Sequence, residues 1–343
     1  MRSPSTGAVE DISSALFHQR ALFESAVPAG GLRMAQDQFL HEPVLLDEVV
    51  ELFAPVPAGW VVDATVGGGG HTAAVLAARP ELSVLGLDRD PDAVTAARAR
   101  LAPFGSRAAV RQARFDELAE AAGSVAGTLS GVLFDLGVSS PQLDRAERGF
   151  SYRAEGPLDM RMDPTAGRDA ASIVNEATEA ELAVLFAAHG EGRLARRLAR
   201  AVVAARPVTS TAELAEVVAA AVPAAVRRRG HPARRVFQAL RATVNEELEQ
   251  LAATLPVALE LLAVGGRCLA IAYHSGEDRL VKAAFAQALT GGCVCPPGLP
   301  CVCGAVPKHR LVFRGARRPS PDEVARNHRA AAARLRAIER TAA

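Results

Sequence analysis

Short apolar runs alternate with amphipathic or alanine-rich stretches along the first half of the chain. Four of these runs have the length and residue types of strands buried on both faces of a parallel sheet. They cover residues 61–62, 82–90, 109–112 and 132–134. The stretches beside them predict helices at residues 41–53, 73–78 and 92–101. Repeated strand–helix alternation of this kind predicts an α/β fold with a doubly wound sheet, whose ligands bind beyond the carboxyl ends of the strands.

The pattern changes after about residue 142. A polar, irregular stretch follows there, and residues 172–222 have the composition of several short helices. A longer helix is predicted over residues 232–255, and an apolar strand at residues 268–272 then returns to the α/β pattern. We therefore predict two domains. An α/β domain comprises residues 39–141 and 231–343, and a helical domain, residues 142–230, is inserted between these two pieces.

The two ends of the chain lack a regular pattern. Residues 1–38 have no sustained periodicity, so we predict an N-terminal extension of low order. Residues 320–343 are basic and alanine-rich, which predicts a helix or coil. No apolar run reaches the roughly 18 residues that a membrane helix needs, and the first residues lack the pattern of a signal peptide. We expect a cytoplasmic protein with no membrane partner.

A glycine-rich turn follows the first predicted strand. The segment 60–72 is WVVDATVGGGGHT, a strand, four glycines and the start of a helix. Glycine allows a close approach of the backbone to a ligand, and a helix N-terminus offers free N–H groups. The spacing is neither GxGxxG nor a turn that ends in GK[ST], which argues against dinucleotides and nucleoside triphosphates. A nucleotide-type cofactor site and a purely structural turn both remain open at this point.

Aspartates end three of the predicted strands, namely Asp63, Asp88 and Asp135. The carboxyl ends of parallel strands share one edge of a sheet, so these three carboxylates should lie close together. An acidic residue at the end of the second strand commonly accepts hydrogen bonds from ribose hydroxyls, and Asp88 has that position. A helix-capping role better suits Asp90. The pattern favours a cofactor that carries a ribose.

Composition adds a local charge signal. Hydrophobic residues make up 49% of the 343 residues and aromatic residues only 4%, so we expect an aliphatic core. The net charge is +1, yet residues 190–241 contain eleven arginines and three acidic residues. Arginine suits phosphate through its charge and its bidentate fork. A solvated helix face is the alternative, but the local excess favours a surface that contacts RNA or DNA, with Arg227, Arg228 and Arg229 as candidates.

Four of the five cysteines lie close together in the sequence, at Cys293, Cys295, Cys301 and Cys303. Four thiolates could bind zinc tetrahedrally, but CxC at both ends is not the usual CxxC spacing. The prolines between them allow a stiffened loop without metal as the alternative. From the sequence we assign no metal ligands.

Several segments together resemble the RsmH (MraW) family of bacterial methyltransferases, which modify the exocyclic N4 of a cytosine in the decoding region of 16S ribosomal RNA. The resemblance runs from residue 41 to about residue 340, in family order. Its most specific part is DLGVSSPQLDRAERGFSYRAEGPLDMRMDP. The other matching segments are HEPVLLDEV, DATVGGGGHT, DRDPDA, HPARRVFQALRATVNEEL and GGRCLAIAYHSGEDR. One departure is HSGEDR, where the family usually has HSLEDR.

The resemblance implies a Rossmann-like class I methyltransferase fold with an inserted helical domain for substrate recognition. It implies S-adenosylmethionine as cofactor and 16S ribosomal RNA within the small ribosomal subunit as partner; the oligomeric state is left open. By motif, the residues that it assigns to the cofactor are Gly69, Gly70, His71, Asp88, Phe115, Asp135 and Gln142. Asp88 would bind the ribose hydroxyls, and Phe115 would lie near the adenine.

For catalysis, we expect hydrogen-bond acceptors that localise the lone pair of the target amine and later take its proton. Asp135 and the turn that follows it, including Ser139, are the candidates, although Asp135 could contact only the cofactor. His274 is a candidate contact to the target nucleotide, and Ser275 could equally cap a helix. Two other functions remain open: an amino-methyltransferase that acts on DNA or another RNA, and a non-catalytic RNA-binding protein.

Overall fold

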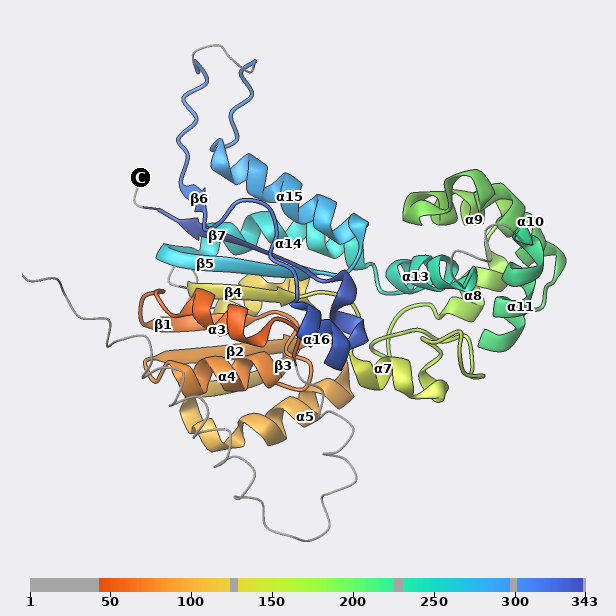
Figure 1. Ribbon diagram of the computed structural model, residues 1–343, viewed down its shortest axis with the longest axis horizontal. Helices are drawn as coiled ribbons and strands as arrows, with labels where there is room; N and C mark the ends of the chain where they lie inside the picture. Colours follow the sequence, from red (N-terminus) through yellow and green to blue (C-terminus); the bar gives the residue numbers. More distant parts are fainter. Residues whose placement is uncertain (1–42, 124–128, 225–230, 297–300, 342–343) are drawn as a thin grey trace, which may run out of the picture. The chain divides into compact units, whose positions relative to one another are not determined.

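Five parallel strands form the centre of the protein, whose computed structural model describes residues 43–123, 129–224, 231–296 and 301–341. They belong to a seven-stranded sheet in the order β3-β2-β1-β4-β5-β7-β6, in which β7 runs antiparallel to β5 and β6 antiparallel to β7 (Figure 1). The strands are β1 (Gly59–Asp63), β2 (Leu82–Asp88), β3 (Ala108–Gln112), β4 (Leu129–Asp135), β5 (Leu262–Ala272), β6 (His309–Leu311) and β7 (Arg334–Arg340). The predicted α/β fold class is confirmed.

Helices cover both faces of this sheet, as a doubly wound architecture requires. One face is covered by α3 (Leu46–Phe53), α4 (Gly70–Ala78) and α5 (Pro91–Leu101). The other face is covered by α6 (Leu118–Ala122), α14 (Glu247–Leu261) and α15 (Ser275–Leu289). Side chains of the central parallel strands face two apolar clusters, so that Val61 faces the first layer of helices and Val62 the second. Both are almost fully buried.

The helix α3 packs very closely on the sheet because a glycine lies beneath it. A Cβ atom at Gly131 of β4 would lie 2.3 Å from Cε1 of Phe53 in α3. Phe53 is 1% exposed and fills this space. The amphipathic segment before the first strand is therefore part of the core.

The C-terminal segment corrects a prediction. Residues 320–343 were expected to form helix or coil, and α16 (Pro321–Arg326) is indeed helical. Residues 334–340, however, form β7, which pairs along β5 from Arg267↔Glu339 to Ala272↔Arg334. Leu335, Ala337 and Ile338 are buried in the sheet. Alanine favours helix locally, but burial of these apolar side chains against β5 outweighs that preference.

The helix predicted over residues 232–255 is also corrected, because the structure has two helices there. They are α13 (Ala233–Val244) and α14, separated by Asn245 and by Glu246, whose φ of 52° is left-handed. The Asn245 side chain is buried and bonded to another segment: its Nδ2 donates to the Met160 carbonyl, and its Oδ1 accepts from the Met162 N–H, each at 2.8 Å. This long-range anchor interrupts the helix.

The insertion between α7 (Ser140–Asp144) and α14 is helical, and its helices lie beside the sheet (Figure 1). It contains α8 (Ala170–Glu176), α9 (Glu179–Phe186), α10 (Ala195–Ala204) and α11 (Thr211–Ala221). We include α13 as well: the sequence placed its residues in the α/β domain, which was predicted to resume at residue 231, but they pack in the apolar cluster of the insertion. Local sequence sets three of their starts: the side chains of Asp169, Thr178 and Ser210 accept hydrogen bonds from first-turn N–H groups of α8, α9 and α11. Such caps satisfy N–H groups that a helix itself leaves unpaired.

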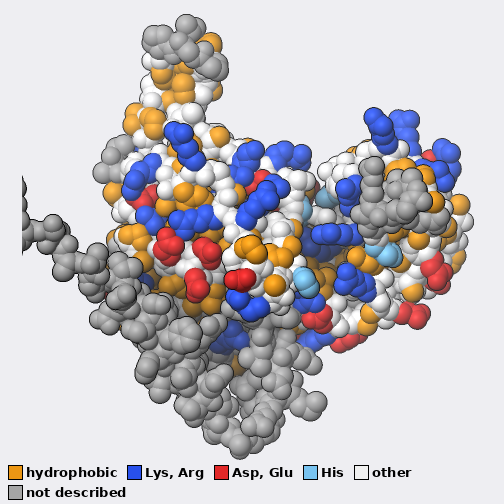
Figure 2. All heavy atoms as spheres, in the orientation of Figure 1, with side chains coloured by type: hydrophobic (Ala, Val, Ile, Leu, Met, Phe, Trp, Pro, Cys, Tyr) orange, Lys and Arg blue, Asp and Glu red, His pale blue; other side chains and the backbone are white. Residues whose placement is uncertain are grey.

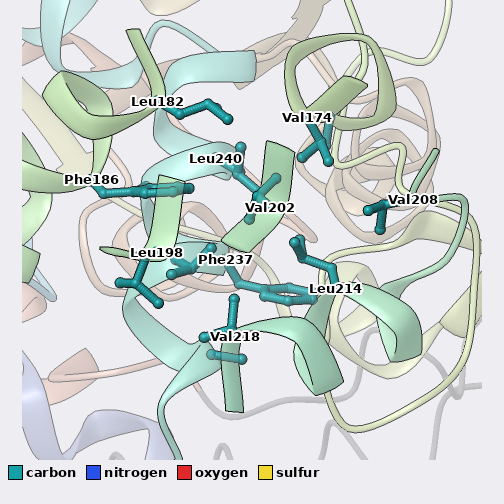
Figure 3. Close-up of a cluster of buried hydrophobic side chains, with 14 of the residues drawn as sticks. Val174, Leu182, Phe186, Leu198, Val202, Val208, Leu214, Val218, Phe237 and Leu240 are labelled. Carbon is teal, nitrogen blue, oxygen red and sulfur yellow. The ribbon is translucent and has the colours of Figure 1, made fainter. Parts of the chain in front are cut away.

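These helices share an apolar cluster of their own (Figure 3). Phe186 of α9 and Phe237 of α13 point into it together with aliphatic side chains from α8, α10 and α11. The insertion thus buries its apolar faces on itself rather than on the sheet. No helix in the described part of the chain is long and apolar enough to cross a membrane.

Replacing Phe186, which is fully buried, tests the importance of this cluster. We expect Phe186→Ala to lower the free energy of unfolding by about 3–5 kcal/mol, because it removes apolar contacts and leaves a cavity. Val184→Ala is the matched control, since Val184 lies on the same helix and is 70% exposed; its effect should stay within about 0.5 kcal/mol. Urea unfolding followed by circular dichroism gives both values, and equal losses would contradict the assignment of the core.

Candidate active site

The carboxyl ends of β1, β2 and β4 lie side by side and bring Asp63, Asp88 and Asp135 to one edge of the sheet. Asp63 is paired in register with Gly86 of β2 and with Leu133 of β4. The sequence-based placement of the three carboxylates is therefore confirmed. Burial makes each charge costly, so each carboxylate needs hydrogen-bond donors around it.

Asp88 is bonded to the glycine turn. Its Oδ2 accepts from the Gly67 N–H and its Oδ1 from the Asp90 N–H, both at 2.9 Å. Gly67 has a φ of +51°, a left-handed conformation that glycine adopts without strain. Burial raises the pKa of Asp88 to about 6, although both backbone donors oppose this shift. The turn therefore holds the carboxylate in place without neutralising it.

The next glycines of the turn have a packing role. A Cβ atom at Gly70 would lie 2.4 Å from Cγ of Pro43, and Gly69 has a φ of +77°. His71 follows them and is buried, with Nε2 donating to the Val44 carbonyl at 2.9 Å and Nδ1 lying 3.7 Å from Oδ2 of Asp135. Gly69, Gly70 and His71 fix the path of the chain into α4, and their contact with a cofactor stays a prediction.

Asp63 is the buried carboxylate at the end of β1. It is 2% exposed, and its Oδ2 accepts from the Thr72 hydroxyl at 2.6 Å. Burial raises the pKa of Asp63, while the Thr72 hydrogen bond and the nearby His71 lower it. Thr72 therefore helps to keep Asp63 ionised beneath the turn.

Asp90 links the sheet edge to the DLGVSSPQLD segment. Its Oδ1 accepts from the Asp92 N–H at the start of α5, as the capping prediction expected. Its Oδ2 accepts from Gln142 Nε2 at 2.8 Å and from the Arg148 guanidinium at 2.9 Å. Gln142 is 4% exposed. This buried carboxylate, its amide partner and its guanidinium partner hold α7 against the end of β2.

Asp135 has a tyrosine as its principal partner. Oδ1 accepts from the Tyr273 hydroxyl at 2.8 Å, and the Asp135 N–H donates to the Thr65 hydroxyl at 2.6 Å. Burial raises the pKa of Asp135, with His71 and the Tyr273 hydrogen bond acting in the opposite direction. Burial and the adjacent carboxylate raise the pKa of Tyr273 well above its usual value, so Tyr273 remains a donor. A carboxylate with a raised pKa is a better proton acceptor.

His274 caps α15 rather than facing the cavity. Its Nδ1 accepts from the Gly276 N–H at 3.1 Å, and its Nε2 lies 2.9 Å from Oε1 of Glu277. Burial opposes ionisation of Glu277, but His274 and Arg241 together hold its pKa below the usual value. Ser275 is the first residue of α15, so the capping role considered for Ser275 belongs to His274.

A cavity of about 130 Å³, partly open to solvent, lies over this edge of the sheet. Five residues that the sequence analysis assigned line it: Asp88, Phe115, Asp135, Ser139 and Gln142. The ring of Phe115 packs edge-on against Phe134, with centroids 6.1 Å apart. Gly69, Gly70, His71 and His274 are not among the residues that line the cavity.

Other lining residues were not assigned from the sequence: Thr65, Gly67, Tyr273, Glu277 and Glu247. All five lie within the segments that carry the family resemblance, but nothing in their spacing shows which side chains face the cavity. Glu247 receives two hydrogen bonds from Arg241, each at 2.8 Å. The sequence therefore showed only that these residues belong to family motifs, and not that they line a cavity.

The residues that line the cavity fit the cofactor that the resemblance implies. Four carboxylates (Asp88, Asp135, Glu247 and Glu277) and one guanidinium (Arg89) line the cavity, which favours a ligand that carries positive charge. Asp88 suits the hydroxyls of a ribose, and Phe115 offers an aromatic surface to a base. A sulfonium compound with an adenosine moiety has all three features.

Comparison with known proteins gives a consistent result. Residues 38–341 match the MraW methylase family. The chain is 46% identical over 313 residues to the ribosomal RNA small subunit methyltransferase H of Heliobacterium modesticaldum, covering 88% of this chain and 99% of that protein. The protein of the same name from Clavibacter michiganensis subsp. michiganensis is 49% identical over 318 residues, covering 90% and 98%. That from Mycobacterium tuberculosis is 48% identical over 319 residues, covering 88% and 80%.

Replacing Thr72 tests the hydrogen bond to Asp63. We expect Thr72→Val to lower the free energy of unfolding by about 2 kcal/mol at neutral pH, since a buried acceptor loses its donor. The pKa of Asp63, already raised in the fold, rises further in the variant. Protonation of Asp63 then relieves the penalty, so the loss should shrink as the pH falls through this raised pKa.

Urea unfolding at neutral and mildly acidic pH measures the effect of Thr72→Val. Thr95→Val is the control, because the Thr95 hydroxyl is exposed and donates only to the Pro91 carbonyl of its own helix. A loss that is the same at both pH values would argue against an ionised Asp63.

Proposed function

This chain belongs to the MraW methylase family, and we propose that it transfers a methyl group from S-adenosylmethionine to the exocyclic N4 of a cytosine in the decoding region of 16S ribosomal RNA. The substrate is the RNA within the small ribosomal subunit. One observation carries the proposal: the family match spans residues 38–341, and the segments that form the acidic cavity lie inside it.

The cofactor-binding residues are proposed from the lining of the cavity and from the motifs. Asp88 accepts hydrogen bonds from the ribose hydroxyls, Phe115 packs near the adenine, and Gln142 closes the same side through its bond to Asp90. When bound, S-adenosylmethionine supplies a methyl group activated by a positively charged sulfur. Gly67, whose N–H already bonds Asp88, lines the cavity and joins the turn residues Gly69, Gly70 and His71 in this set.

Asp135 is the proposed acceptor for the amine. The lone pair of a cytosine amine is delocalised into the ring, so a carboxylate that accepts its N–H localises the pair and later takes the proton. The Tyr273 hydroxyl donates to Oδ1 of Asp135. We therefore assign Oδ2 as the acceptor of the N–H of the amine. Ser139 lines the cavity beside it and is the second candidate acceptor.

His274 has a different part in this proposal. Because its ring caps α15 and does not line the cavity, we assign it to the positioning of Glu277 rather than to a contact with the nucleotide. Glu277 Oε2 in turn accepts from the Tyr273 N–H at 2.7 Å. This backbone hydrogen bond fixes the position of Tyr273, whose hydroxyl donates to Asp135.

The helical insertion supplies the proposed RNA surface. Arg193, Arg196, Arg197 and Arg200 are exposed in and just before α10, and Arg234 and Arg235 are exposed in α13. Figure 2 shows Lys and Arg side chains gathered over these helices. Arg200 and Arg235 also have acidic neighbours, Glu179 and Glu191. The guanidinium groups of Arg206 and Arg241 are only partly exposed and bonded within the protein, and Arg227, Arg228 and Arg229 lie outside the described residues. Exposed guanidinium groups bind phosphates without reading sequence.

Labelled methyl transfer to small ribosomal subunits, with mapping of the modified nucleotide, tests the function. We expect the wild-type protein to label one cytosine at N4, and Asp135→Asn to lower the rate about 100-fold or more, because an amide cannot take the proton. The dissociation constant for S-adenosylmethionine should change by less than about tenfold.

The exposed Asp116, which pairs with Arg114 outside the cavity, provides the matched control Asp116→Asn, with an expected rate like that of the wild type. A parallel loss of rate and of cofactor affinity in Asp135→Asn would limit Asp135 to cofactor binding, and no loss of either would remove both roles. Methylation of naked DNA in place of ribosomal subunits would overturn the proposed substrate.

Asp88→Asn tests the assignment of the ribose site. We expect its dissociation constant for S-adenosylmethionine to rise about 10- to 100-fold, as for the loss of a hydrogen bond to a charged group. In the wild type, affinity should fall as the pH drops through about 6, where Asp88 becomes protonated. This decline should be smaller in the variant.

Isothermal calorimetry across this pH range measures both effects, and a thermal melt establishes that the variant is folded. Asp92→Asn is the control, since its side chain is half exposed beside Arg145. An affinity of Asp88→Asn equal to that of the wild type would exclude the ribose assignment.

A further inference from the structure

We propose that Cys293, Cys295, Cys301 and Cys303 bind one zinc ion in the segment between α15 and β6. Their four Sγ atoms all lie within 4.8 Å of one another. This proposal replaces the sequence-based assignment of no metal ligands. It concerns a region separate from the cavity, since none of the four cysteines lines it.

The sulfur–sulfur distances suit a tetrahedral ion. Sγ of Cys301 lies 3.4 Å from that of Cys293 and 3.4 Å from that of Cys303, and the Cys303–Cys293 pair is 3.6 Å apart. Four thiolates at the usual Zn–S distance of about 2.3 Å have Sγ atoms about 3.8 Å apart. A disulfide would instead bring two sulfurs to about 2.05 Å. The four thiols are close enough to share one ion without being bonded to one another.

The path of the chain explains how CxC spacing can serve such a site. The segment leaves α15 and returns to β6, so each CxC pair lies on a different arm (Figure 1). The arms approach closely near their base, where a Cβ atom at Gly291 would lie 2.5 Å from the Val306 carbonyl oxygen. Higher up, the Val302 N–H donates to Cys295 Sγ at 3.4 Å. Two ligands come from each arm, and the pairing of the arms replaces the wider turn of a CxxC motif.

Apolar burial does not account for the convergence of these thiols. In the described part of the segment, the large apolar side chains point into solvent: Val294 is 85% exposed, Val302 88% and Val306 56%. The segment projects away from the sheet with apolar side chains on its surface (Figure 2). Small structures that cannot build a core commonly rely on a metal or on disulfides. Four cysteines close together in a segment without an apolar core are the expected arrangement for a structural metal site.

The ligand chemistry identifies the ion and its role. Soft thiolates select zinc or iron–sulfur clusters over magnesium or calcium, and four cysteines around one centre of this size fit a single Zn²⁺. A complete set of four protein ligands leaves no position for water or substrate. The site is therefore structural, and it holds the two arms of the segment together.

Metal analysis of the purified full-length chain tests this proposal. We expect about one zinc per chain in the wild type and loss of that zinc in the double variant Cys301→Ser/Cys303→Ser. Reduced, metal-free protein should bind Co²⁺ and develop the intense charge-transfer and visible bands of tetrahedral thiolate coordination, and Zn²⁺ should displace them.

Two variants serve as controls for the metal analysis. Val302→Ser alters an exposed side chain in the same segment, and Cys268→Ala removes the remaining cysteine, which is buried in β5; both should retain the wild-type zinc content. The proposal is overturned if reduced protein binds neither Zn²⁺ nor Co²⁺, or if the double variant keeps its zinc. Iron in place of zinc, or native mass spectra that show two disulfides without metal, would overturn it equally.

Discussion

Burial of carboxylates at one edge of the sheet is the constraint on which the rest of the site depends. Asp63 and Asp90 are each 2% exposed, and Asp88 and Asp135 lie beside them. A charge removed from water is tolerated only when donors surround it. The Gly67 N–H, the Thr72 hydroxyl and the Tyr273 hydroxyl supply such donors. The glycine turn and the end of β5 thus both supply hydrogen bonds to the buried carboxylates. The same carboxylates make the cavity acidic.

The same requirement connects segments that are remote in the sequence. Asp90 binds Gln142 and Arg148, and Arg148 also donates to the carbonyls of Arg161 and Met162. The irregular segment after α7 thus closes one side of the cavity, although it has little regular secondary structure. Its order comes from buried polar contacts with the sheet edge. This explains why a polar, glycine-bearing stretch can belong to a well-defined site.

The sequence was sufficient for features that depend on local pattern. The parallel strands, the aspartates at their ends and the Asp90 cap follow from apolar runs and from capping chemistry. Features set by distant partners were missed. Residues 334–340 form a strand because β5 is available to pair with them, and α13 ends where Asn245 binds the 160–162 backbone. Tyr273 and Glu277 face the cavity, whereas the adjacent His274 caps a helix, a distinction that no spacing in the sequence encodes.

Directional polar contacts join the insertion to the sheet domain. Each has its own apolar cluster, and the junction is made by Asn245, whose carbonyl accepts from Arg89 at 2.7 Å and whose side chain bonds the 160–162 segment. Arg89 itself follows β2 and lines the cavity. Hydrogen bonds constrain orientation more strictly than apolar packing does. The junction thus connects the insertion directly to a residue of the cavity wall, because Asn245 accepts from Arg89.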